Sequence, residues 1–202
     1  MSEQELQALR LRTTRSLWDA TYVDESWIGD AGPDGGIVRL LPRMRAWVAA
    51  HYPRTKLAMT EYNWGALDHV NGALAQADVL GIFGREGLDL ATLWAPPAAT
   101  EPGAFAFRMY RNYDGQGSRF GDIAVHATSS DRARVAVYAA QRTADGVTTV
   151  VAINKESSPV TATLALAGFD TGAAAQVYQY SAADLAAIHR LADLALPAGR
   201  VV

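Results

Sequence analysis

The sequence contains no cysteine among its 202 residues, which excludes disulfide bonds and cysteine-based zinc sites. No apolar run is long enough to span a bilayer, so we expect no membrane partner. The first ten residues also lack the apolar core of a signal peptide. If the chain is part of a longer protein, that last absence says nothing about export.

Strong charge of either sign is missing as well. The net charge is −3, and the basic residues form no cluster, which predicts that nucleic acid is not a partner. The histidines do not pair at metal-ligand spacing, and the sequence has neither a glycine-rich phosphate loop nor a Gly-x-Ser-x-Gly turn. Half of the residues are apolar and 19% are charged, which is typical of a globular protein.

Helical and strand-like patterns alternate over residues 37–113. The first 36 residues look like a polar, turn-rich loop. Apolar spacing then predicts helices over residues 37–51, 70–84 and 100–112, with strands over residues 56–60 and 88–94 between them. Pro42 must lie in the first turn of its helix. The alternation indicates a parallel sheet with crossover helices.

The pattern changes near Gly115–Gly121, where short β-type runs begin. Asp145-Gly146 predicts a hairpin turn, and the evenly spaced runs indicate a β-sandwich. Ser181 followed by Asp184 predicts a capped helical turn. The predicted strands cover residues 123–128, 135–141, 148–154, 160–166 and 174–180.

Glu61 is the sharpest catalytic candidate. It follows a predicted buried strand and begins the tetrad Glu61-Tyr62-Asn63-Trp64. Sugar hydrolysis uses a carboxylate at the anomeric carbon, a neighbouring phenol or amide, and flat rings that stack on pyranose faces. The alternative is an ordinary surface glutamate at the end of a strand.

Further aromatic and charged residues are candidates with equally good structural explanations. Trp94, at the end of the second strand, could form the floor of a sugar subsite or cap the core. Trp18, Tyr22 and Trp27 could bind a ligand or pack their loop onto the fold. The candidates with the weaker functional interpretation are Asp19, Asp24, Glu25 and His69.

These residues lie in stretches that closely resemble glycoside hydrolase family 44, a family of endo-β-1,4-glucanases and xyloglucanases. The resemblance covers most of the chain and includes the long run from Gly72 to Gly87. The matching stretches are residues 15–19, 21–28, 60–65, 72–87, 137–142 and 153–155.

The resemblance implies the C-terminal portion of a (β/α)8 TIM-type barrel, with strands seven and eight in residues 1–118, followed by a β-sandwich in residues 119–202. It implies that Glu61 is the nucleophile of a configuration-retaining reaction. Trp94 would line the subsite beside the scissile bond, and Trp18 would lie along the sugar cleft. Tyr62 and Trp64 are the further expected substrate-binding residues.

The chain departs from the family in one important way. The general acid of the family is a glutamate preceded by asparagine after strand four, and this sequence has no Asn-Glu pair. We therefore expect a β-1,4-glucan hydrolase whose isolated chain is poorly active and whose barrel an N-terminal fragment could complete. The alternatives are a non-catalytic sugar-binding remnant and an inactive fragment.

The resemblance also implies an extracellular location and a β-glucan partner such as cellulose, carboxymethylcellulose or xyloglucan. We expect no cofactor for catalysis. The sequence leaves open whether a structural calcium ion is bound, because the oxygen ligands of calcium need not be adjacent in sequence.

Overall fold

The computed structural model describes residues 1–32, 34–168, 172–196 and 200–201. Its helices are α1 (Glu3–Thr13), η1 (Thr14–Leu17), α2 (Trp27–Ala31), η2 (Asp34–Gly36), α3 (Leu40–His51), α4 (Val70–Glu86) and α5 (Pro102–Arg111). The strands are β1 (Ala58–Tyr62), β2 (Leu90–Leu93), β3 (Ile123–Val125), β4 (Val135–Gln141), β5 (Thr148–Asn154), β6 (Leu164–Ala165), β7 (Ala174–Ala175), β8 (Tyr178–Ser181), β9 (Asp184–Arg190), β10 (Leu194–Ala195) and β11 (Arg200–Val201).

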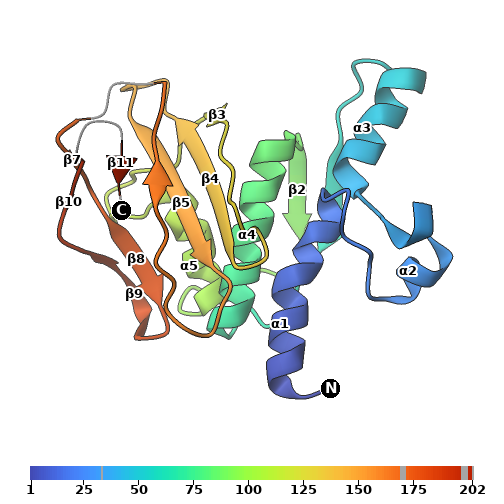
Figure 1. Cartoon of the computed structure of the whole chain (residues 1–202), viewed down its shortest axis with the longest axis horizontal. Helices are drawn as coiled ribbons and strands as arrows, with labels where there is room; N and C mark the ends of the chain where they lie inside the picture. The colour runs from blue at the N-terminus through green and yellow to red at the C-terminus, as the bar shows by residue number, and fades with distance from the viewer. Residues whose placement is uncertain (33, 169–171, 197–199, 202) are drawn as a thin grey trace.

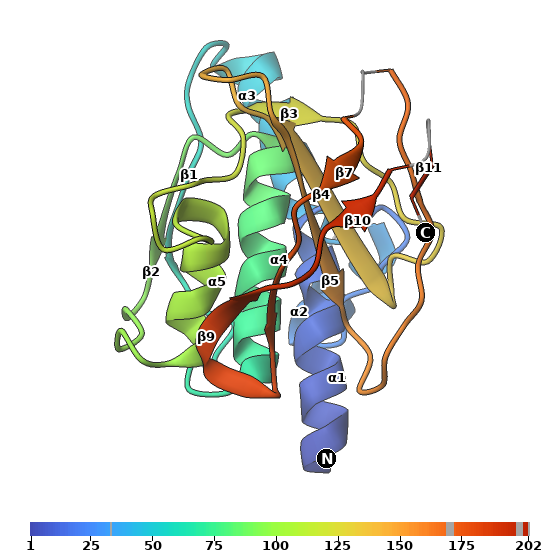
Figure 2. The ribbon, with the colours of Figure 1, turned by 90° about the vertical axis from the view of Figure 1, so that its left-hand side faces the viewer.

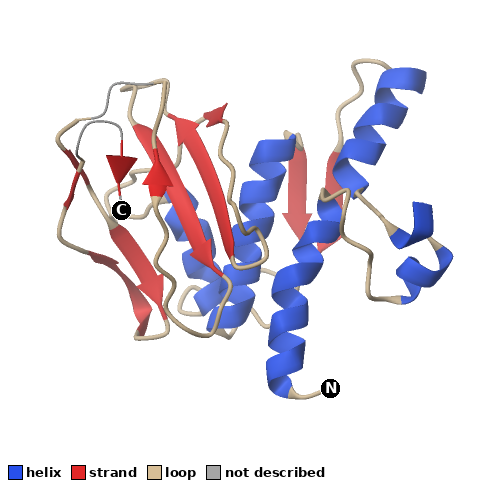
Figure 3. Cartoon of the chain, viewed as in Figure 1, coloured by secondary structure: helices blue, strands red, loops and turns tan. Residues whose placement is uncertain are grey.

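Three layers organise these elements. The parallel pair β1–β2 lies on one side of α4 and α5, and the antiparallel sheet β3–β4–β5 lies on the other (Figures 1 and 2). Coloured by type, the strands form two separate groups with helices between them (Figure 3). The helical layer therefore connects the part that carries Glu61 to the antiparallel part.

The predicted alternation of helices and parallel strands over residues 37–113 is confirmed. β1 and β2 pair in parallel, with Ala58 opposite Leu90 and Tyr62 opposite Leu93. α4 ends at Glu86 and continues past Gly84, and Gly87 caps it in the left-handed conformation that glycine adopts without strain. α3 begins at Leu40 rather than at residue 37, with Pro42 in its first turn as predicted.

The interpretation of residues 1–36 as a polar loop was wrong for its first third. α1 covers Glu3–Thr13 and begins with a capping box, in which Ser2 and Glu5 bond each other's backbone N–H groups. Leu11 is the buried residue of α1, so the apolar stripe is too narrow to stand out in the sequence.

The antiparallel part follows the prediction closely at β4 and β5 and diverges later. The Asp145-Gly146 turn joins β4 to β5, and every residue of β4 is paired with one of β5. The predicted helical turn at Ser181–Asp184 was wrong, because this segment is the turn between the antiparallel strands β8 and β9. The run over residues 160–166 contributes only the two residues of β6, Leu164 and Ala165.

The helical layer and the antiparallel sheet share one hydrophobic core. Tyr138 on β4 packs against Gly81 on α4 so closely that a Cβ at Gly81 would lie 2.3 Å from the tyrosine ring. Val79 and Ile82 on α4 have no exposed surface, and Ile153 on β5 is 3% exposed. The predicted boundary at residue 118 stays a prediction, and the residues on its two sides pack directly on each other.

A buried ion pair lies at the same contact. Asp78 on α4 is 1% exposed and accepts hydrogen bonds from Lys155 Nζ, Tyr138 Oη and Thr14 Oγ1, each at 2.6 Å. The carboxylate thus binds the residue after β5, the middle of β4 and the start of η1. The pKa of Tyr138 is raised by burial and by the neighbouring carboxylate, so its hydroxyl stays protonated and donates.

Within the described ranges, no helix combines the length and apolar composition needed to cross a membrane.

We predict that Lys155→Met lowers the free energy of unfolding by about 3–5 kcal/mol, because it leaves the Asp78 carboxylate buried without its cation. Urea denaturation monitored by circular dichroism measures this loss.

The matched control is Arg134→Met, which removes the cation from a pair with Glu156 at 3.5 Å whose side chains are 53% and 40% exposed. Exposed pairs contribute less than about 1 kcal/mol. Equal, small losses in both variants would contradict the structural role of the Asp78 network.

Candidate active site

Glu61 lies at the C-terminal end of β1 in a β-bulge. Met59 pairs with Ala91 and Tyr62 with Leu93, so two residues of β1, Thr60 and Glu61, stand opposite the single residue Thr92. A bulge of this kind bends the strand and redirects a side chain, and bulges are over-represented next to active sites. The register between the strands therefore sets the direction of Glu61.

The backbone of Glu61 is in the left-handed region, with φ of 62°. This conformation costs an L-residue roughly 1–2 kcal/mol and persists only where the surroundings impose it. The Glu61 N–H lies 3.4 Å from Thr92 Oγ1. The side chain of Glu61 is exposed rather than paired within the core. Its strained backbone is therefore better explained by the direction of the carboxylate than by stability.

Trp94 lies beside the bulge, directly after the neighbouring strand β2. Its backbone N–H donates to the carbonyl of Tyr62 at 3.0 Å, directly after the Glu61 position. The Trp94 side chain is 62% exposed, so it does not cap the core of this chain. An exposed indole next to an exposed carboxylate is a suitable surface for a sugar ring.

Tyr62, expected to bind substrate, lies in the core instead. It is 7% exposed, its ring packs edge-on against Phe83 at 5.1 Å, and its hydroxyl accepts a hydrogen bond from Gln76 Nε2 at 2.8 Å. Tyr62 thus packs against α4 and is not part of the exposed surface that carries Glu61 and Trp94.

Trp64 is half-buried and fixed against α1. Its indole N–H donates to Thr13 Oγ1 at 3.1 Å, and its carbonyl accepts from Arg10 Nε at 3.0 Å. Arg10 also donates to the buried Asn71 at 2.6 Å. These bonds hold the loop that follows Glu61.

Trp18 is half-buried between two arginines. The Arg85 guanidinium lies 3.9 Å from its ring centroid and that of Arg132 lies 5.2 Å away. Its neighbour Asp19 is buried and bonded to Arg15 and Thr21. This placement favours the packing interpretation over a sugar platform for Trp18 in the present chain.

The other carboxylates of this loop are bonded locally. Glu25 binds the guanidinium of Arg12 through both oxygens at 2.6 Å and accepts from Tyr22 at 2.7 Å. The bond from Arg12 holds the pKa of the Glu25 carboxyl below its usual value, against the smaller effect of burial. A general acid must hold its proton near neutral pH, so Glu25 is a poor substitute for the missing one.

His69 has the structural role that its position predicted. It precedes α4 and its Nδ1 accepts a hydrogen bond from the Asn71 backbone N–H at 3.1 Å. Asp24 is likewise bonded to Ser16 and Ser26.

Two polar residues on α4 were missed by the sequence interpretation. Gln76 and Asp78 are each 1% exposed and stand within the otherwise apolar run of residues 72–83. Their signal in the sequence is polarity at positions that helical spacing assigns to the core, because buried polar groups need a specific partner.

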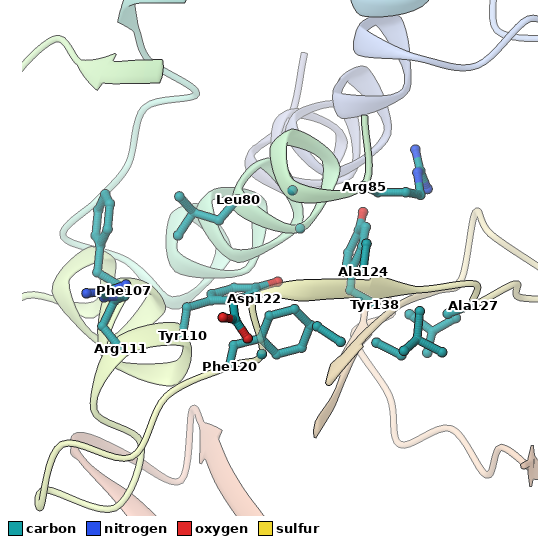
Figure 4. Close-up of a pocket in the computed structure, with 17 residues that line it drawn as sticks. Leu80, Arg85, Phe107, Tyr110, Arg111, Phe120, Asp122, Ala124, Ala127 and Tyr138 are labelled. Carbon is teal, nitrogen blue, oxygen red and sulfur yellow. The ribbon is translucent and has the colours of Figure 1, made fainter. Parts of the chain in front are cut away.

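A cavity of about 380 Å³ lies on the opposite side of α4 from β1 (Figure 4). Apolar side chains of α4, α5 and β4, among them Leu80, Phe107 and Val137, form its walls, and Arg85, Arg111 and Asp122 also contribute. Its position between the helical layer and the antiparallel sheet separates it from Glu61. Neither Glu61 nor Trp94 lines this cavity.

Nowhere in the described ranges do three or more His, Asp or Glu side chains gather as metal ligands would. The structural calcium ion left open by the sequence stays a prediction.

Known proteins resemble this chain in sequence and in structure, although no family model matches it. Endoglucanase A of Paenibacillus lautus is 36% identical over 176 residues, which are 86% of this chain and 25% of that protein. The crystal structure of CelM2, a bifunctional glucanase-xylanase from a metagenome library, superposes with a TM-score of 0.92 at 46% identity. The match covers all of this chain and 37% of CelM2.

A xyloglucanase of glycoside hydrolase family 44 from Paenibacillus polymyxa, solved with xyloglucan, superposes with a TM-score of 0.90 at 31% identity. The chain therefore matches the C-terminal portion of enzymes of glycoside hydrolase family 44. It spans 37–39% of these family 44 structures, whose complete fold is larger. The resemblance seen in the motifs of the sequence is thereby confirmed.

The strain assigned to Glu61 predicts an unusual response to glycine. Glu61→Gly should raise the free energy of unfolding by roughly 0.5–1 kcal/mol, because relief of the left-handed backbone exceeds the entropy that glycine adds to the unfolded chain. Chemical denaturation of the purified variant checks this.

Thr60→Gly is the control, since Thr60 precedes Glu61 in the same exposed strand with an ordinary backbone. It should destabilise the chain by about 1 kcal/mol. If Glu61→Gly destabilises by a similar amount, the backbone at Glu61 is not strained.

Proposed function

We propose that the chain is the nucleophile-bearing part of a retaining β-1,4-glucan hydrolase. The observation that carries this proposal is the strained bulge at the C-terminal end of β1, which presents Glu61 on the exposed face beside Trp94. The names of the relatives add the substrate class, since they are an endoglucanase, a glucanase-xylanase and a xyloglucanase.

In the proposed reaction, the Glu61 carboxylate attacks the anomeric carbon and forms a glycosyl ester, while the bond to the leaving oxygen breaks. That oxygen takes a proton from a general acid, which then activates the water that hydrolyses the ester. The two carboxyl groups must lie about 5–5.5 Å apart. Glu61 supplies the first, and we propose that a polypeptide preceding this chain supplies the second.

The exposed face of β1–β2 supports the proposal that a preceding polypeptide completes the active site. Parallel sheets are normally covered on both faces, yet Leu90 is 53% exposed and Ala58, Thr60 and Thr92 on the same face are exposed as well. We propose that β1 and β2 are strands seven and eight of a (β/α)8 barrel that an N-terminal polypeptide completes. The antiparallel strands after residue 118 would then form the β-sandwich.

A sugar-binding remnant without catalysis is the second candidate. Its support is the exposure of Trp94 and of Trp27, which is 76% exposed on the short helix α2. Extracellular glucan polysaccharide is the proposed ligand in either case, because the relatives are named as glucanases and a xyloglucanase, and one of them was solved with xyloglucan.

We predict that this chain alone releases few or no reducing ends from carboxymethylcellulose or xyloglucan, since loss of general acid catalysis typically costs 10²–10⁴-fold. Mixing it with the part of the CelM2 chain that precedes the matched region should restore turnover. Glu61→Gln should abolish the restored activity.

Glu25→Gln is the matched control and should retain the restored activity, because Glu25 is bonded to Arg12 and Tyr22 rather than placed for chemistry. Turnover that survives Glu61→Gln would overturn the assignment. Binding of cellohexaose in calorimetry, with no turnover from any mixture, would favour the sugar-binding remnant.

A further inference from the structure

A buried amide on α4 bonds the residue that directly follows Glu61. Gln76 is 1% exposed, and its Nε2 donates to the hydroxyl of Tyr62 at 2.8 Å. A polar amide in a core is costly unless it is hydrogen-bonded, and an apolar residue of similar size would fill the same space. The position of Gln76 is therefore better explained by the group it holds than by packing.

That group is next to the bulge. Glu61 and Tyr62 share a peptide bond, so any rotation of the Glu61 backbone out of the left-handed region moves the Tyr62 ring. The ring is fixed at one end by the Gln76 amide and along its edge by Phe83 at 5.1 Å. Two residues after Tyr62, Trp64 is held by Thr13 and Arg10. The segment after Glu61 is thus clamped by two helices.

We propose that Gln76 is a positioning residue for Glu61. Through the Tyr62 hydroxyl it holds the bulge in the left-handed conformation, and it thereby keeps the Glu61 carboxylate on the exposed face beside Trp94. The functional meaning rests on the proposed role of Glu61 as nucleophile, whereas the conformational effect does not depend on it.

The helix that carries Gln76 is itself fixed from the other side. Asp78 stands two residues further along α4 and bonds Lys155, Tyr138 and Thr14. Positions 76 and 83 face β1, while positions 78 and 81 face the antiparallel sheet, as helical spacing requires. The antiparallel sheet therefore sets the position of α4, and α4 sets the position of the bulge through Gln76.

The test is nuclear magnetic resonance of the full chain with ¹³C,¹⁵N-labelled glutamate, in which the Glu61 signals are identified by their loss in Glu61→Gln. Tyr62→Phe removes the hydroxyl alone, and Gln76→Met removes the amide at similar length. In both variants the Glu61 amide and carboxyl signals should shift, and exchange of the Glu61 amide hydrogen should become about fivefold faster. The double variant should match either single one, because all three lack the same bond.

Tyr110→Phe is the matched control. Tyr110 is 9% exposed and its hydroxyl donates to the Ala77 carbonyl at 2.9 Å, so this variant also removes a buried tyrosine bond to α4. It should lower stability yet leave the Glu61 signals and exchange unchanged.

The proposal is overturned if Tyr62→Phe lowers stability as Tyr110→Phe does but leaves the Glu61 signals in place. It is also overturned if Tyr62→Phe and Tyr110→Phe shift the Glu61 signals equally. Tyr62→Phe deletes one atom, so it carries the test even if Gln76→Met does not fold. Because these measurements need no activity, a failed hydrolysis assay and a failed positioning test are separate results.

Discussion

The buried carboxylate of Asp78 is the interaction on which the rest of the structure depends. It joins η1, α4, β4 and the residue after β5 through three short hydrogen bonds, one of them to the buried cation of Lys155. In a medium of low dielectric constant such a network has few alternative arrangements, since each unpaired group would be costly. It fixes α4 against the antiparallel sheet, and the position of β1 follows from α4.

Because α4 is fixed, it can hold the strained backbone of Glu61 in β1 in place. The left-handed backbone of Glu61 is unfavourable in isolation, and it is maintained by Thr92 on β2, by Gln76 on α4 through Tyr62, and by α1 through Trp64. Gln76 and Tyr62 are buried and Trp64 is half-buried, while Glu61, Thr92 and Trp94 are exposed. A carboxylate held in one direction by rigid surroundings suits the proposed role of Glu61 as a nucleophile.

Much of this architecture could be predicted where the pattern is local. Helical spacing predicted α4, short β-type runs on either side of Asp145-Gly146 predicted β4 and β5 with their boundaries, and the position after a strand singled out Glu61. The capping box of Ser2 and Glu5 was a readable signal for α1, but the surrounding residues lack a clear apolar stripe. The same Ser-x-x-Asp pattern that caps helices formed the β8–β9 turn, because strand pairing decided between them.

The remaining features depend on residues far apart in the sequence. The bulge arises because two residues of β1 stand opposite one residue of β2. Asp78 bonds Lys155, which lies 77 positions away in the sequence. No local sequence pattern predicts the register between two strands or a contact between residues so far apart. Tyr62 was expected on the sugar surface because it follows Glu61, and the bulge instead turns it into the core.

The most direct test of the nucleophile is covalent trapping with a 2-deoxy-2-fluoro-β-cellobioside that carries a dinitrophenolate leaving group. This group departs as an anion, so the step needs Glu61 but not the missing general acid. Mass spectrometry of proteolytic peptides should find the added disaccharide on Glu61, either in the chain alone or after mixing with the preceding CelM2 polypeptide. A label on another carboxylate, or no label in an otherwise active mixture, would contradict the account.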